Sequence, residues 1–319
     1  MGNRSENNSL KETSEIMSSH KMSLLALVVV FSIVLSAVNI NPHFAIVLGQ
    51  TNATGEIKKV HVGDIDIAYK MFGNGDPIIL ISGYSAPLDF WDPTLLETLA
   101  SNHTVITFDN RGIGNTTFGN KSFTIQQFAD DTSGLLNALN IKKADMMGWS
   151  MGGFIAQELA LTHPDKVGKL IIYASICGGK ESVPPTPDVI KIFSDQSGTS
   201  LDRIKRFMPM LFPPEWRTQN PNYLQDLPVI TEKISNETLN LQTQAIMNWS
   251  GTCDRLNSLS QPTMVIVGTD DNLTVPANSL LMTEKIAGAW LVQIKGGGHG
   301  LMFQDPEEFS NLVITFLKS

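Results

Sequence analysis

A serine with one glycine two positions before it and another two positions after it is the clearest sign of chemistry in this chain. The motif Gly-Trp-Ser-Met-Gly is centred on Ser150, and it joins an apolar, strand-like segment to a helical one. A serine on a sharp strand-to-helix turn projects its hydroxyl above the sheet, and small neighbours are needed because larger side chains would collide there. The motif alone is weak evidence, but in this context it predicts that Ser150 is a nucleophile.

A serine hydroxyl is a poor nucleophile at neutral pH, so the site needs an imidazole to accept its proton and a carboxylate to orient that imidazole. Of the six histidines, His299 is suitably placed, because its glycine-rich loop follows the last predicted strand and precedes the last predicted helix. Two adjacent acids, Asp270 and Asp271, come just after an earlier predicted strand that is largely apolar. Adjacent side chains point in different directions, so one acid should orient His299, and the residues alone leave open which one.

Two backbone N–H groups are candidates for stabilising the negative charge that develops on a substrate oxygen. Met151 opens the helix after Ser150, which gives it an aligned N–H and the positive end of the helix dipole. Tyr84 lies in the loop after the third predicted strand, where Gly83 permits a close approach of the backbone. The alternative for this loop is an ordinary tight turn.

The elements that must position these residues follow an α/β pattern from residue 56 onward. Short apolar runs rich in β-branched residues alternate with helical-period segments, which is typical of a mostly parallel sheet flanked by helices. Eight strands are predicted, the first two hairpin-like, at 58–62, 65–71, 77–82, 104–109, 144–148, 169–173, 263–268 and 290–294. Helices are predicted at 93–101, 124–139, 151–162, 279–286 and 306–317.

Residues 181–259 interrupt the alternation, because they contain several prolines and helical segments but no convincing strand. We interpret them as a helical cap inserted between two strands, whose apolar side chains could line a pocket above the serine. The candidate substrate-binding residues are Phe212, Trp216 and Trp249 in the cap, together with Trp149 beside the nucleophile. The alternative is that such aromatic residues pack the core of the insertion itself.

The N-terminal part of the chain lies outside this α/β domain of residues 56–319. Residues 1–22 are polar, residues 23–40 form an apolar stretch rich in Leu, Ile and Val, and residues 41–55 form a linker. The apolar stretch predicts a cleaved signal peptide or an uncleaved membrane anchor, and the long, net-neutral preceding segment favours the anchor. We therefore expect an exported protein, secreted or membrane-anchored. Glycosylation sequons support this weakly; those beyond the apolar stretch are at Asn52, Asn102, Asn115, Asn120, Asn236, Asn248 and Asn272.

Composition limits the partners of this 319-residue chain. Its formal net charge is -8 and its basic residues form no run, which argues against nucleic acid and favours a small uncharged substrate. The two cysteines, Cys177 and Cys253, have no metal-site spacing, so no metal is expected. Two buried free thiols are the expectation for them. The alternative is a disulfide, which export would permit and which would tie the cap to the sheet.

The motifs together resemble the α/β-hydrolase superfamily, in its esterase and cofactor-free haloperoxidase-like branch, over residues 57–317. Residues 108–114 look like the family signature in which Asp109 and Arg111 are structural. In the family, the carboxylate three positions after the glycine that ends this strand orients the histidine. Counted from Gly268, the resemblance implies that this acid is Asp271. The sequence differs from the family pattern at Ser82, where many members have histidine. Because the proposed oxyanion donor in this loop is a backbone N–H, the difference casts little doubt on activity.

The resemblance and the residues lead to the same expectation: a serine hydrolase that cleaves a small, mostly apolar carboxylic ester through an acyl-enzyme, with no cofactor. Peracid formation, lactone opening and carbon–carbon bond hydrolysis use the same triad and stay open as alternatives. A ligand-binding, receptor-like hydrolase with slow turnover is a further alternative. Steady turnover of several acyl esters would separate the enzyme from the receptor.

Overall fold

One eight-stranded sheet forms the centre of the computed structural model, which describes residues 55–195, 197, 210–228, 232 and 234–319. The strands are β1 (Lys58–Val62), β2 (Ile65–Gly73), β3 (Asp76–Ile81), β4 (His103–Phe108), β5 (Ala144–Trp149), β6 (Val167–Tyr173), β7 (Thr263–Gly268) and β8 (Trp290–Ile294). Their order is β1-β2-β4-β3-β5-β6-β7-β8, and β2 alone runs antiparallel to its neighbours. The predicted fold class is confirmed.

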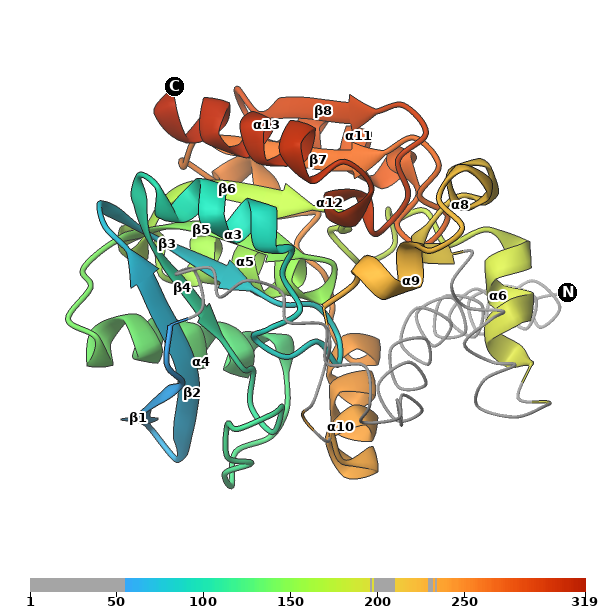
Figure 1. Cartoon of the computed structure of the whole chain (residues 1–319). Coiled ribbons are helices and arrows are strands. Elements are labelled where there is room, and N and C mark those ends of the chain that lie inside the picture. The colour runs from blue at the N-terminus through green and yellow to red at the C-terminus, as the bar shows by residue number, and fades with distance from the viewer. Residues whose placement is uncertain (1–54, 196, 198–209, 229–231, 233) are drawn as a thin grey trace, which may run out of the picture.

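Helices cover both faces of this sheet (Figure 1). Helix α3 packs against α13 on one face, and α4 packs against α5 on the other. Their bounds are α3 (Pro93–Ala100), α4 (Ile125–Ala138), α5 (Met151–Thr162) and α13 (Pro306–Lys318). Helix α11 (Pro276–Lys285) packs on β7 and β8. It begins three residues before the predicted start, because proline is favoured in a first helical turn.

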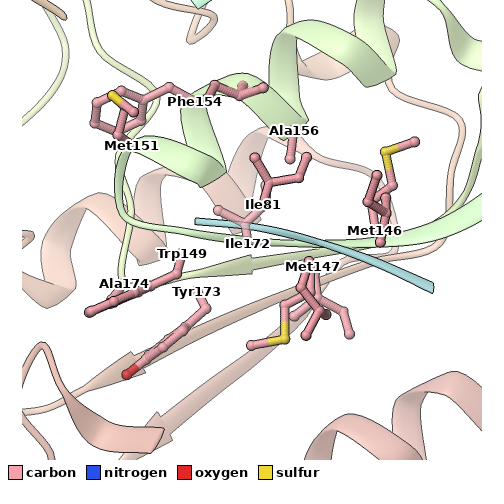
Figure 2. Packing of buried hydrophobic residues seen from close by; sticks show 14 of the residues in the cluster. Ile81, Met146, Met147, Trp149, Met151, Phe154, Ala156, Ile172, Tyr173 and Ala174 are labelled. Carbon is pink, nitrogen blue, oxygen red and sulfur yellow. The ribbon is translucent and has the colours of Figure 1, made fainter. Parts of the chain in front are cut away.

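The strands at the middle of the sheet are buried on both faces, which is why their sequences read as continuous apolar runs. Strand β5 lies between β3 and β6, with Gly148 paired to Ile81 on one side and Trp149 paired to Tyr173 on the other. Figure 2 shows the side chains of Trp149 and Tyr173 lying on one side of these strands and Phe154 of α5 on the other. Ser150 therefore follows the carboxyl end of a central strand, where open α/β sheets bind ligands.

The predicted cap is a set of helices between β6 and β7. It contains α6 (Pro187–Ser194), α8 (Pro214–Gln219), α9 (Tyr223–Asp226) and α10 (Asn236–Met247). Figure 1 places these helices together to one side of the sheet, beyond the carboxyl ends of the strands. Because β6 and β7 are hydrogen-bonded neighbours, the chain leaves the sheet and returns beside its point of departure.

The expectation of two free thiols is wrong, because Cys177 and Cys253 form a disulfide. Cys177 lies shortly after β6, and Cys253 lies in the turn that leads back towards β7. The pairing of β6 with β7 brings the two ends of the insertion together, so the alternative, a disulfide that ties the cap to the sheet, is the one found. The bond closes the cap at its base.

Residues 1–22, 23–40 and most of 41–55 lie outside the described residues, so the predicted leader or anchor stays a prediction, as do the domain boundaries. Within the part of the chain that the structure describes, no helix has the length and apolar character needed to cross a membrane.

Candidate active site

The backbone at Ser150 has the strained conformation expected of a strand-to-helix elbow, with φ 57° and ψ -119°. A side chain at Gly152 would run into the backbone carbonyl of Ile81, and one at Gly148 would run into the backbone of Gly152. The carbonyl of Ser150 accepts two hydrogen bonds, one from the Ser175 hydroxyl and one from the backbone N–H of Gly153, both at 2.9 Å. Glycine is therefore required at both motif positions.

The acid and the imidazole lie together, completely buried. His299 Nδ1 is 2.9 Å from Asp271 Oδ2. The other oxygen, Oδ1, accepts the backbone N–H groups of Leu273 and Thr274, each at 2.9 Å, and the Thr274 hydroxyl donates to Oδ2 at 2.7 Å. The neighbouring Asp270 is exposed and accepts the Thr269 hydroxyl. Of the two adjacent acids, Asp271 is thus the one that contacts His299.

Burial alone would raise the pKa of Asp271, but the charge of His299 and the hydrogen bonds from His299 and Thr274 hold that pKa below its ordinary value. The carboxylate is therefore ionised at neutral pH. An ionised, fully hydrogen-bonded carboxylate fixes the orientation of the ring, which leaves Nε2 as the nitrogen that can exchange a proton with a hydroxyl.

The backbone carbonyl of His299 is held by two side chains from the sheet. The Trp149 indole N–H donates to it at 3.2 Å and the Tyr173 hydroxyl donates to it at 2.9 Å. The Tyr173 oxygen also accepts the backbone N–H of Met302 at 3.1 Å, in the short helix α12 (Leu301–Gln304). Trp149 stacks on Tyr173 with ring centroids 6.1 Å apart and lies 5.8 Å from the His299 ring. These contacts bring the histidine loop to the residue that precedes Ser150.

The loop after β3 approaches Ser150 closely. A methyl group placed on Gly83 would lie 3.2 Å from Ser150 Cβ and 3.9 Å from its Oγ. The following residue, Tyr84, donates its hydroxyl to the carbonyl of Leu239 in α10 at 3.1 Å. Met151 is the first residue of α5. Of the two predicted oxyanion donors, Met151 thus follows Ser150 directly and Tyr84 follows the glycine that lies against Ser150.

Phe212 and Trp216 belong to an aromatic cluster that joins the cap to the histidine loop. Their rings stack at 5.1 Å, and Phe212 also lies edge-on to Phe303 of α12 at 6.5 Å. The backbone N–H of Gly300, beside the histidine, donates to the carbonyl of Leu211 at 2.9 Å. Phe212 is fully buried. This cluster anchors the cap above the site.

Trp249 lies on the other side of the sheet, over α5. Its ring stacks on Phe154 at 4.6 Å and its indole N–H donates to Glu158 at 2.7 Å. Glu158 in turn accepts Arg255 at 2.7 Å. These contacts join the base of the cap to α5, and they are separate from the contacts that surround Ser150.

The signature residues Asp109 and Arg111 make structural contacts. The Asp109 carboxylate accepts the backbone N–H groups of Leu88 and Asn115, and burial raises its pKa to about 7. Arg111 binds Asp131 at 2.7 Å and a second carboxylate at 2.9 Å. Neither residue contacts the proposed triad through these bonds.

Three residues near the site had no sequence signal. They are Tyr173, whose hydroxyl bridges β6 and the histidine loop; Thr274, which holds the acid; and Gln242 of α10, whose Oε1 accepts the N–H of Ser85 at 2.9 Å. Their partners are remote in the sequence or depend on the turn geometry. Among the described residues, no cluster of His, Cys, Asp and Glu has the arrangement of a metal site.

Similarity to known proteins agrees with this geometry. Residues 76–219 match the profile of the alpha/beta hydrolase fold. A relative from Rhizobium rhizogenes named as a carbamate hydrolase, RutD, is 30% identical over 247 residues, which cover 76% of this chain and 92% of the relative. BpoC of Mycobacterium tuberculosis, named as a non-heme bromoperoxidase, is 27% identical over 80% of this chain and 98% of its own. An alpha/beta hydrolase fold protein from Chitinophaga pinensis superposes with a TM-score of 0.72 at 25% identity, covering 85% of this chain and all of the other.

The chain therefore belongs to the α/β-hydrolase family and is a hydrolase. Within that family its relatives include bromoperoxidase-like members, as the sequence motifs predicted.

Proposed function

We propose that the protein is a serine hydrolase that cleaves a small, mostly apolar carboxylic ester through an acyl-enzyme intermediate. Ser150 Oγ attacks the ester carbonyl while His299 Nε2 accepts its proton, and Asp271 orients and stabilises the imidazolium. The N–H groups of Tyr84 and Met151 bind the oxyanion. His299 then protonates the leaving alcohol. In the second half, His299 removes a proton from water, which attacks the acyl group and releases the acid and Ser150.

The observation that carries this proposal is the coincidence of three features at one edge of the sheet. Ser150 has a strained elbow conformation at the start of α5, Gly83 lies against it, and the buried Asp271–His299 pair is tied to the adjacent Trp149. Strain of this kind is maintained only where the surrounding structure compensates for it, and it is concentrated at functional sites.

The test is hydrolysis of a short-chain 4-nitrophenyl ester by the purified protein, together with covalent labelling by a fluorophosphonate. We expect Ser150→Ala to lose the label and to lose at least about 1,000-fold in kcat, because the nucleophile is removed. Ser260→Ala, the same change at an exposed serine, serves as the matched control. Unchanged hydrolysis by the Ser150→Ala variant would refute the proposal.

Carbamate hydrolysis is a second candidate, because the 30% identical relative is named for it. Attack on a carbamate carbonyl uses the same nucleophile and oxyanion donors, so the two reactions differ in the leaving group and the pocket. Transfer of the acyl group to hydrogen peroxide is a third, suggested by the bromoperoxidase relative. A panel of matched esters, carbamates and lactones, assayed with and without peroxide, would rank them by kcat/KM.

We also propose that the protein acts outside the cytoplasm, anchored to or released from a membrane. The apolar stretch of residues 23–40 supports export, and the disulfide between Cys177 and Cys253 is of the kind that persists in oxidising compartments. Cell fractionation of the full chain tests this: recovery in the cytosolic fraction with reduced thiols would contradict it.

A further inference from the structure

Two buried polar groups beside the β3 loop have no hydrogen-bond partner among the described residues. They are the amide nitrogen Nε2 of Gln242 and the hydroxyl Oγ of Ser85, and both residues are completely buried. Buried donors left unpaired are costly, so native proteins satisfy nearly all of them with protein, water or ligand. Two such groups at one place therefore indicate a partner that is not part of the fold.

The two open groups flank one hydrogen bond. The backbone N–H of Ser85 donates to Oε1 of Gln242 at 2.9 Å, and an N–H can bond only to the oxygen of that amide. This bond places the amide oxygen against the Ser85 N–H and leaves the NH2 group on the other branch of the same amide, next to this contact. The Ser85 hydroxyl belongs to the same residue. One acceptor atom placed there could receive hydrogen bonds from both side chains.

This position is next to the proposed oxyanion donors. Ser85 follows Tyr84 directly, and Gly83 lies against the side chain of Ser150. Gln242 comes from α10 in the cap. The Tyr84 hydroxyl fastens α10 to the same loop, because it bonds to the carbonyl of Leu239 and to the hydroxyl of Thr243. The two groups are thus contributed from the sheet and the cap to the same part of the site.

We propose that Gln242 and Ser85 form a polar subsite that binds a second carbonyl oxygen of the substrate, a few bonds from the scissile ester carbonyl. The amide NH2 can only donate and the hydroxyl can donate, so the bound atom is an acceptor. Both groups are uncharged, and an anion here would be buried without a compensating charge, so a neutral carbonyl fits best. The subsite rests on the proposed esterase function and assigns its substrate class: esters of oxo acids.

The test compares two esters of nearly equal size, ethyl 3-oxobutanoate and ethyl butanoate. The quantity is the ratio of their kcat/KM values, which cancels effects common to both esters. Gln242→Met keeps the length of the side chain but removes both the NH2 donor and the oxygen that accepts the Ser85 N–H, whereas Ser85→Ala removes only the hydroxyl. We expect the ratio to fall about tenfold in the first variant and severalfold in the second, because a hydrogen bond to the substrate is lost. Gln244→Met, the same change at an exposed position of the same helix, should leave the ratio unchanged.

The outcomes separate the subsite from the catalytic proposal. If both variants hydrolyse the two esters with the wild-type ratio, the subsite is refuted and the esterase function stands. If the wild-type protein hydrolyses neither ester and the fluorophosphonate does not label Ser150, the proposed function fails and the subsite fails with it. Should Gln242→Met not fold, Ser85→Ala decides the question alone, since it removes one oxygen atom and nothing else.

Discussion

The Tyr173 hydroxyl makes a sharp prediction, because one atom joins the central sheet to the histidine loop. It donates to the carbonyl of His299 at 2.9 Å and accepts the N–H of Met302 at 3.1 Å. Burial raises the pKa of Tyr173 well above its ordinary value, so the hydroxyl stays protonated in any practical assay. Tyr173→Phe removes this oxygen and leaves the ring in place.

The cost follows from what each partner retains. The carbonyl of His299 keeps the indole N–H of Trp149 at 3.2 Å, so its loss is that of one ordinary hydrogen bond, about 1 kcal/mol. The N–H of Met302 is in the first turn of α12, where it has no partner within the helix, and it is buried without an acceptor in the variant. That adds about 1 to 3 kcal/mol. We expect Tyr173→Phe to lower the free energy of unfolding by about 2 to 4 kcal/mol.

Urea denaturation under non-reducing conditions measures this loss. Tyr69→Phe is the matched control, because the Tyr69 hydroxyl has no hydrogen-bond partner among the described residues and its ring is also buried. We expect kcat for an ester to fall by about 10- to 100-fold in Tyr173→Phe, since a displaced histidine loop misplaces the base, with a smaller change in KM. A change in unfolding free energy below about 0.5 kcal/mol, equal to that of the control, would refute the reasoning.

Three further predictions concern pH, redox state and the elbow. Burial raises the pKa of Asp109 to about 7 in the folded protein, whereas the same carboxyl loses its proton near pH 4 in the unfolded chain. Between these two values the folded state binds more protons, so the free energy of unfolding should fall by up to about 4 kcal/mol as the pH rises from 4 through 7. Asp109→Asn should flatten the dependence of the unfolding free energy on pH, measured by denaturation across this range; an unchanged dependence would contradict the assignment. Reducing the disulfide between Cys177 and Cys253, which are 76 residues apart, should lower the unfolding free energy by about 4 kcal/mol, and a double Ser variant should lose all sensitivity to dithiothreitol. Gly152→Ala would place a methyl group against the carbonyl of Ile81, so fluorophosphonate labelling should be lost even where circular dichroism finds a folded protein.

The strands and their order along the chain could be predicted because each has a local signal. Strand β7 is a run of buried apolar residues that ends at a glycine, and β5 ends at the motif around Ser150, so the elbow and both remaining loops were placed from sequence alone. Asp271 could be preferred over Asp270 only through the family resemblance. The structure adds the physical reason, which is that Asp271 is buried against Thr274 and His299.

Other parts of the site depend on contacts between distant segments and left no local trace. Tyr173 reaches a carbonyl 126 positions away, and Gln242 reaches an N–H 157 positions away. A buried tyrosine or glutamine in an apolar segment reads the same whether or not it has such a partner. The disulfide was only the alternative expected from the sequence, since Cys177 and Cys253 meet because β6 and β7 are neighbours in the sheet.

That meeting point places both ends of the cap segment at one place on the sheet. The chain departs after β6 and re-enters before β7, and the disulfide joins these two crossings, so both covalent connections of the segment between Cys177 and Cys253 lie side by side. The proposed nucleophile, acid and base all lie outside it, whereas Gln242 and Phe212 lie within it. Replacing this segment, with Ser150, Asp271 and His299 kept, should therefore change which substrates are accepted more than it changes the reaction performed on them.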